Sequence, residues 1–214
     1  MHVLQMNFRK DPNIGLYALA TDKYALLPRF LKRKELRKTK KVLKTRLIQA
    51  SVHGLDFLGI FLVGNSQGLL IPKIADEGEV KLNCLQLKTK FSALGNLVVC
   101  NDNGCLVSPY LEKRAKQIQK FLKVPVKVAT IGGSRIIGSQ CIATNKGFIA
   151  TPRITDKEFK LFENVLQVKG DVGTVNLGSF FVKSALIANS NGFLVSEATR
   201  GPEIARIDEA LGFL

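Results

Sequence analysis

The feature that most constrains the fold is a phrase that recurs five times along the 214-residue chain. Each occurrence begins with an apolar residue and a glycine, continues as an apolar run and ends in a polar turn. The turn reads TDKY at 21–24, NSQG at 65, NDNG at 101, NKG at 145 and NSNG at 189. The apolar–glycine pairs are Ile14-Gly15, Leu58-Gly59, Leu94-Gly95, Ile137-Gly138 and Leu177-Gly178, at intervals of 44, 36, 43 and 40 residues. Such a period predicts supersecondary units that pack side by side.

The turn residues indicate what each unit contains. Asn and Gly tolerate the left-handed backbone of tight hairpins, so two apolar runs around an Asn/Gly turn predict a β-hairpin. The second run ends at a proline in four units and at Glu197 in the fifth; the prolines are Pro28, Pro72, Pro109 and Pro152. Proline ends strand pairing and is favoured at the first position of a helix.

A helix and a third strand follow the hairpin in most units. Apolar spacing predicts helices over 110–122, after Thr155 and from Pro202, and Thr155 with Glu158 is typical of a capping box. Strand-like runs follow at 124–131 and 166–175, so the unit reads ββαβ. In the second unit Gly78 stands where a helix interior would be, which predicts a truncated or 3₁₀ helix.

Five such units can close into a ring or form an open solenoid. A closed ring protects more strand edges, and we expect an α/β fold of this kind, with the solenoid as the alternative. The expected organisation is one domain over 1–214, with repeats at about 1–56, 57–92, 93–135, 136–175 and 176–214.

Composition narrows the function classes. No apolar run approaches the roughly 18 residues that span a bilayer, and the N-terminus lacks the apolar core of a signal peptide, so we expect a cytoplasmic protein. The four cysteines form no CxxC pair, and with two histidines they are a poor metal set. We therefore expect no metal or other cofactor.

The net charge of +15 is concentrated in one segment. Residues 29–46 hold ten Lys or Arg and one acid, Glu35, and Leu36, Leu43 and Leu47 predict one apolar stripe on a basic helix. Cations of this density favour a phosphate backbone, although a merely solvated helix face gives the same pattern. The candidate RNA contacts are Lys32, Arg33, Arg37, Lys40, Lys41 and Lys44.

Several motifs, in their order along the chain, resemble one family. SALGN at 92–96 with CNDNGCLVSP at 100–109, GTVNLGS at 173–179 and ATRGPEIARIDEALG at 198–212 are similar to the archaeal form of translation initiation factor 6. NIGLYALATDKYALLPRFL at 13–31 and LGIFLVGNSQGLLIPK at 58–73 resemble its first two units. Arg200 departs from the family wording, which has threonine there, so local contacts near it are open.

The resemblance implies both a fold and a function. The fold is the pentein, a five-bladed α/β propeller of pseudo-symmetric ββαβ units. The implied activity is binding to the large (50S) ribosomal subunit, which sterically prevents association with the small (30S) subunit, and a role in large-subunit maturation. Implied partners are ribosomal protein uL14 and RNA near the sarcin-ricin loop, with release by an elongation-factor-like GTPase and its partner protein. We expect a monomer that binds no membrane.

Two other functions remain as alternatives. A basic propeller could bind nucleic acid in general through 29–46. Other penteins modify guanidino groups with a cysteine nucleophile, but no cysteine occurs between Lys169 and Leu214, so we expect no enzyme.

The repeat also predicts where a binding surface lies. Superposed units place the residues after each glycine in a ring around the axis, and some of them are polar. The candidate ribosome-binding residues are Leu16, Ile60, Asn96, Ser139 and Ser179, with Thr174 and Asn176 as weaker candidates.

Overall fold

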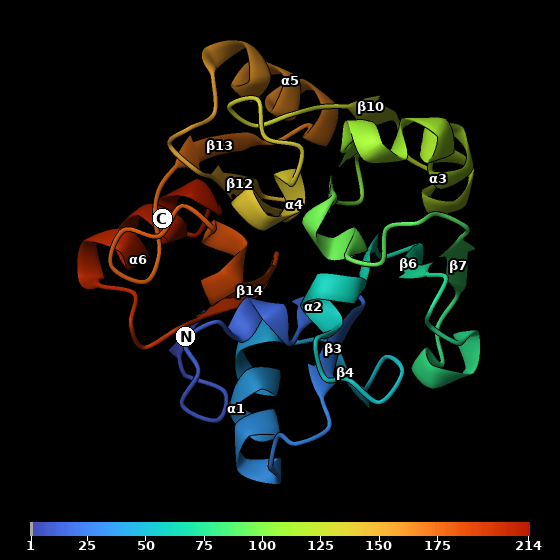
Figure 1. Cartoon of the computed structure of the whole chain (residues 1–214). Helices are drawn as coiled ribbons and strands as arrows, with labels where there is room; N and C mark the ends of the chain where they lie inside the picture. The colour runs from blue at the N-terminus through green and yellow to red at the C-terminus, as the bar shows by residue number, and fades with distance from the viewer. Residues whose placement is uncertain (1) are drawn as a thin grey trace.

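The computed structural model describes residues 2–214 and arranges them as five three-stranded sheets around a central axis (Figure 1). Four sheets come from consecutive segments, and in each the hairpin is antiparallel and the third strand runs parallel to the second. Their strands are β2 (Leu19–Ala20), β3 (Tyr24–Pro28), β4 (Arg46–Ala50); β5 (Val63–Asn65), β6 (Gly68–Pro72), β7 (Cys84–Leu87); β8 (Val98–Cys100), β9 (Cys105–Val107), β10 (Val126–Val128); β11 (Cys141–Ala143), β12 (Gly147–Ala150) and β13 (Lys169–Val172). This is the expected five-bladed pentein.

The fifth sheet joins the two ends of the chain. Its hairpin is β14 (Leu186–Asn189) and β15 (Gly192–Val195), and its third strand is β1 (Val3–Gln5), which pairs in parallel with β15. Figure 1 shows the N- and C-termini on the same side of the molecule. The ring is therefore closed and the open solenoid is wrong. The expected first repeat, 1–56, contributes strands to two sheets, because β1 belongs to the fifth.

Helices lie at the periphery of the ring (Figure 1). They are α1 (Arg33–Leu43), η4 (Pro109–Arg114) continuing into α3 (Ala115–Leu122), α5 (Asp156–Leu166) and α6 (Gly201–Ala210). In place of a peripheral α-helix the second unit has the 3₁₀ turn η2 (Glu77–Val80), as predicted from Gly78. The capping box of Thr155 and Glu158 is also confirmed.

The basic helix is shorter than the predicted segment. α1 ends at Leu43, where Lys44 takes the left-handed conformation that terminates it. Leu47 lies in strand β4 instead, so it is not part of the helical stripe. The buried residues of α1 are Thr39, Val42 and Leu43, and the predicted Leu36 packs partly buried against the same core cluster.

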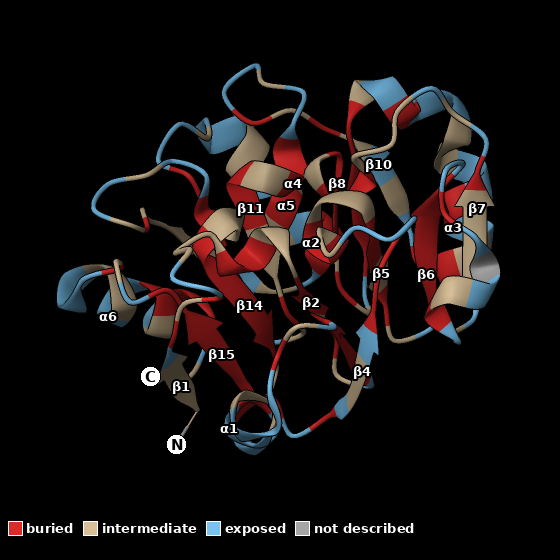
Figure 2. Cartoon of the chain, turned by 60° about the horizontal axis from the view of Figure 1, so that its bottom comes forward, coloured by how far each residue is buried: buried red, intermediate tan, exposed pale blue. Residues whose placement is uncertain are grey.

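The hydrophobic core is divided among the blades and shared between neighbours. One cluster, for example, joins Leu106 of β9 to Phe148 of β12 and Phe162 of α5. Figure 2 shows inner strands such as β6, β14 and β15 buried, whereas outer strands such as β4 and β7 and much of the peripheral helices are intermediate or exposed. Because each cluster spans two blades, a single blade cannot bury its own apolar surface.

Buried asparagines at the hairpin turns connect successive blades. The side-chain amide of Asn101 donates to the carbonyl oxygens of Thr144 (2.9 Å) and Leu166 (2.8 Å), in the next turn and at the end of the next helix. Asn65 makes the same pair of bonds to Asn101 and Leu122, and Asn189 to Thr21 and Leu43. Each asparagine thus satisfies one carbonyl that the end of a helix leaves without a partner and one carbonyl of the neighbouring turn.

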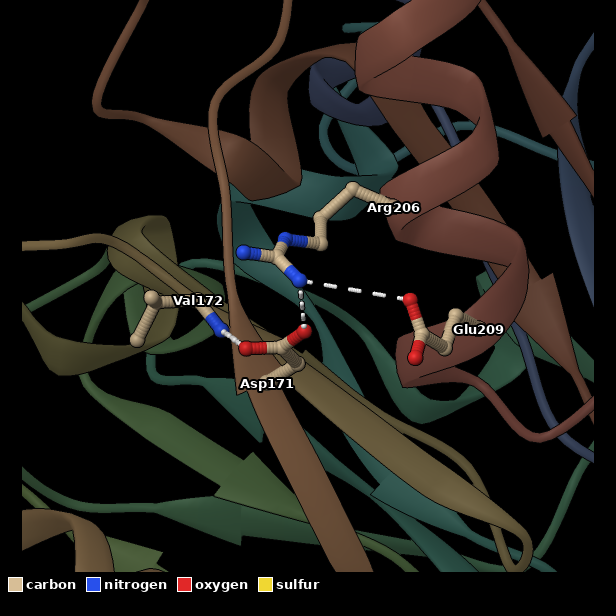
Figure 3. A network of polar contacts seen from close by, with 4 residues as sticks. All are labelled: Asp171, Val172, Arg206 and Glu209. Carbon is tan, nitrogen blue, oxygen red and sulfur yellow. Dashed lines mark hydrogen bonds and ion pairs between the residues drawn. The ribbon is translucent and has the colours of Figure 1, made fainter.

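A charged contact fixes the last helix to the preceding blade (Figure 3). Arg206 of α6 forms an ion pair with Asp171 of β13, with 2.9 Å between Nη1 and Oδ2, and its distance to Glu209 is 3.9 Å. The other Asp171 oxygen accepts from the Val172 amide at 2.7 Å. The ion pair is exposed enough that we assign it a positioning role and little stability.

Replacing a turn asparagine tests the connection between blades. Asn101→Ala removes the donor of the buried Thr144 carbonyl oxygen and leaves the Leu166 oxygen only the long bond from Asn103 (3.4 Å), so we expect the free energy of unfolding to fall by about 2–4 kcal/mol. Asn164→Ala, at an exposed position of α5, is the matched control and should change it by less than about 0.5 kcal/mol. Urea denaturation measures both, and equal effects would contradict the assignment.

Candidate binding site at the axis

Five short helices surround the axis on one face of the ring. They are η1 (Ile14–Leu16), α2 (Leu58–Phe61), η3 (Leu94–Asn96), α4 (Ile137–Gln140) and η5 (Val182–Ala185), and each contacts the next around the circle. The repeat had suggested that strands begin directly at the glycines. A single helical turn precedes each inner strand instead, and Figure 1 shows α2 and α4 near the centre.

Glycine is required in four of these turns because neighbouring backbones touch. A Cβ atom on Gly59 would lie 2.0 Å from the Gly15 carbonyl oxygen, and one on Gly95 would lie 2.0 Å from that of Gly59. The same clash repeats at Gly138, 2.3 Å from the Gly95 oxygen, and at Gly15, 1.8 Å from the Lys183 oxygen. Any side chain there would push two blades apart.

Lys183 occupies the fifth position of this circle. The pair Leu177-Gly178 was expected there, but Gly178 lies in the preceding loop, with φ +99°, and Val182-Lys183 begins η5. The signal that could have found it is spacing: each of the other four glycines stands six residues before the buried turn residue, and Lys183 stands six before Asn189. The apolar–glycine pattern does not identify this position, because the fifth blade has Lys183 in place of the glycine.

The Lys183 side chain reaches across the axis to two other blades. Its amine donates to the carbonyl oxygens of Gly59 (3.1 Å) and Gly95 (2.6 Å). Burial lowers the pKa of this amine to about 8. No carboxylate within residues 2–214 forms an ion pair with the amine that would raise its pKa again. The thiols of Cys100 and Cys141 also face it and act weakly in the opposite direction.

A hollow of about 350 Å³ opens above Lys183, on the face that carries the short helices. Four of the predicted ring residues line it: Leu16, Asn96, Ser139 and Ser179. Ile60 is not among its lining residues, and Ser184 holds the position that the repeat had assigned to Ser179. Four of the five candidates therefore line one hollow together with Ser184, and their role in ribosome binding stays a prediction.

The two weaker candidates face local partners. The Thr174 hydroxyl donates to Glu203 at 2.8 Å, and the Asn176 side chain accepts from the hydroxyls of Ser196 and Thr199. These bonds tie the loop before η5 to the beginning of α6. Both residues support the loop and are not among those lining the hollow.

The glutamate near the start of a peripheral helix holds the adjacent loop in three blades. Glu79, Glu158 and Glu203 accept from the backbone amides of His53, Gly132 and Gly178, at 2.8–2.9 Å. Burial raises the pKa of Glu158 and Glu203, but the hydrogen bonds they accept outweigh it, so both pKa values are lowered. Sequence reasoning identified only the helix cap at Glu158, because the loop partners are distant in sequence.

Large apolar side chains are exposed in the loops that enter the short helices. Ile136 and Phe181 immediately precede α4 and η5, line the hollow and are 38% and 47% exposed. Leu55 and Leu177, in two equivalent loops, are 45% and 65% exposed. A mainly apolar hollow that carries a few polar side chains, with exposed apolar residues in the loops beside it, is the composition expected of a protein-binding face.

All six candidate RNA contacts are exposed on or beside α1. The segment lies at the periphery, away from the axis in Figure 1. The amine of Lys40 donates to the Thr45 carbonyl oxygen at 2.7 Å, and the others have no ion pair within residues 2–214. The structure thus has two separate surfaces, one axial and one basic.

Among residues 2–214, no helix has the length and apolar character needed to cross a membrane. In the same part of the chain, no three His, Cys, Asp or Glu side chains gather as a metal site would require.

Comparison with known proteins gives a consistent result. The model of the eIF-6 family matches residues 3–210. The chain is 34% identical to translation initiation factor 6 of Pyrococcus horikoshii, over the whole length of both chains. It is 35% identical to the proteins of that name from Methanocaldococcus jannaschii, with 99% of each chain covered, and Saccharolobus islandicus, with 99% of this chain and 100% of the other.

The lowered pKa of Lys183 predicts a pH dependence of stability. Between pH 8 and about 10.5 the unfolded chain holds a proton that the folded chain has released, so stability rises with pH in that window. Lys183→Met removes this rise. We expect the free energy of unfolding of the unmodified protein, relative to Lys183→Met, to increase by up to about 3 kcal/mol from pH 8 to 10.5. A constant difference in urea denaturation across that range would contradict a lowered pKa.

Proposed function

The chain belongs to the eIF-6 family, and from this we propose that it binds the large ribosomal subunit through the axial face and so keeps the small subunit from joining. The relatives are named translation initiation factors, which implies a role at the ribosome. The finer assignment rests on the hollow: it combines polar side chains with an apolar rim on a rigid ring.

The polar side chains of the hollow are suited to an external partner. Neither the Asn96 amide nor the Ser184 hydroxyl has a hydrogen-bond partner among residues 2–214, and both are part of the lining. The Ser139 hydroxyl donates to the Ile136 carbonyl oxygen and the Ser179 hydroxyl accepts from the Phe181 amide, so these serines contribute to the shape of the hollow. A protein surface that seats Leu177 and Phe181 could satisfy Asn96 at the same time, and the proposed partner is uL14, beside RNA of the sarcin-ricin loop.

Inhibition in this proposal is steric and involves no turnover. A cysteine nucleophile needs a lowered pKa, whereas a hydrogen bond with Cys100 together with burial raises the pKa of Cys105, and burial raises that of Cys141. A monomer bound on the joining surface of the 50S subunit suffices to exclude the 30S subunit. An elongation-factor-like GTPase with its partner protein would then release it, in the cytoplasm, at the end of subunit maturation.

Sedimentation of washed subunits tests the proposal. Added protein should pellet with 50S and not with 30S subunits, and at saturation it should abolish formation of 70S particles. Undiminished 70S formation at saturating protein would overturn the proposal.

Substitutions in the hollow locate the binding face. Asn96→Glu or Ser139→Glu introduces a charge into the contact, so we expect affinity for the 50S subunit to fall at least about tenfold with folding retained. Asn103→Glu, exposed at the hairpin turn of the same blade, is the matched control and should bind normally. Equal binding by all three variants would remove Asn96 and Ser139 from the site.

A second candidate function is general nucleic-acid binding through α1, favoured by its six exposed cations. It predicts strong binding to naked RNA that weakens steeply with salt, and a smaller salt slope for Arg37→Glu/Lys41→Glu. The ribosome-specific proposal predicts that binding to 50S subunits persists at salt concentrations that abolish binding to naked RNA. Fluorescence anisotropy across a salt series separates the two.

A further inference from the structure

Lys183 stands between two spaces on the axis. It contributes to the lining of the surface hollow of about 350 Å³ and to that of an inner cavity of about 50 Å³ between the inner strands. The same amine is bonded to the carbonyl oxygens of Gly59 and Gly95. It is a half-buried cation that has no role in the steric mechanism proposed above.

The hydrogen-bond partners of this amine accommodate its neutral form. An unprotonated amine has two hydrogens and one lone pair, and two carbonyl oxygens accept those two hydrogens. An ammonium group can donate to the same oxygens and to solvent in the hollow. In the neutral amine, however, the lone pair points away from the two carbonyl oxygens, as a nucleophilic lysine requires.

The free-base fraction supports the same conclusion. With a pKa of about 8, about one Lys183 amine in ten is neutral at pH 7. An ordinary lysine, with a pKa near 10.4, has roughly one in 3,000. The ionisable groups that face the amine are the thiols of Cys100 and Cys141. They act to raise its pKa, but burial lowers it by more.

The hollow can hold a small electrophile beside the amine. Its polar lining includes the Asn96 amide and the Ser184 hydroxyl, which are free to donate to carbonyl or phosphate oxygens. Leu16, Ile136 and Phe181 supply apolar walls for a short acyl chain. An anionic donor is further attracted by the protein's net charge of +15.

We propose that Lys183 is a site of N-acylation and that small acyl phosphates are the acyl donors. The neutral amine attacks the carbonyl carbon, and the bond between that carbon and the phosphate oxygen breaks. Inorganic phosphate leaves with the electron pair of the broken bond, and the nitrogen loses one proton to solvent. The product is an uncharged amide at the floor of the hollow.

Acylation changes the binding face in two ways. The amide retains one N–H, so either the Gly59 or the Gly95 carbonyl oxygen loses its donor. The acyl group also takes up space beside Asn96 and Ser139. If the axial face is the ribosome-binding face, acylation weakens subunit binding; this regulatory consequence rests on the proposed function, whereas the modification does not.

Acylation rates of the purified full-length protein test the modification. Acetyl phosphate is the probe, and peptide mass spectrometry gives a rate for each lysine between pH 6.5 and 9.5. At pH 7 we expect Lys183 to react about tenfold faster than the exposed Lys41 and Lys113, because its larger free-base fraction outweighs its lower basicity. In denaturing urea this advantage should disappear. A Lys183 rate in the folded protein equal to or below the other two would overturn the proposal.

Cosedimentation tests the regulatory consequence. Acetylated protein is mixed with 50S subunits and compared with unreacted protein and with acetyl phosphate-treated Lys183→Arg. The fraction acetylated at Lys183 should be at least threefold depleted in the pellet, while treated Lys183→Arg binds as its untreated form does. Equal distribution of the acetylated form would overturn the regulatory part. Failure of the unreacted protein to pellet would contradict the proposed function and leave the acylation rates as they stand.

Discussion

The contact on which the rest of the structure depends is the approach of backbone to backbone around the axis. In four turns a glycine Cα meets the carbonyl oxygen of an adjacent blade so closely that a Cβ atom would lie within 2.3 Å of it. This approach brings the inner strands together, and the shared apolar clusters can then form only if all the blades keep that distance. The hollow, its polar lining and its apolar rim are consequences of this spacing.

Much of this architecture is predictable from the sequence because the repeat places Asn and Gly where the backbone needs turn conformations that other residues rarely adopt. The Asn/Gly turns predicted the hairpins, and Gly78 predicted the short connection of the second blade. The same asparagines were read only as turn formers, however. Their amides bond to carbonyls 36 to 168 residues away, and such partners cannot be identified before the blades are placed.

The candidate site shows where a pattern of residue types fails. Leu16, Asn96 and Ser139 were predictable since their blades carry the apolar–glycine pair; Ser179 also lines the hollow, although the pair that pointed to it lies in the loop before η5. Lys183 was not predictable, because it occupies the position that glycine holds in the other four blades. Its side chain extends into the axis and donates to two carbonyl oxygens. The position is defined by its distance to Asn189 and not by its chemical type. Lys183 is therefore the position at which this ring of short helices departs from the repeat.

The pairing of β1 with β15 has a consequence for biosynthesis. Val3 lies opposite Phe193, so the strand made first has no partner until almost the entire chain has left the ribosome. During synthesis the first strand and the edge of the unfinished fifth sheet are both open to other partners. Pairing β1 with β15 requires a contact between the two ends of the sequence. Because this contact closes a very long loop, its loop-closure entropy cost is high and it forms slowly. This member of the eIF-6 family thus completes its own ring only as it leaves the ribosome that makes it.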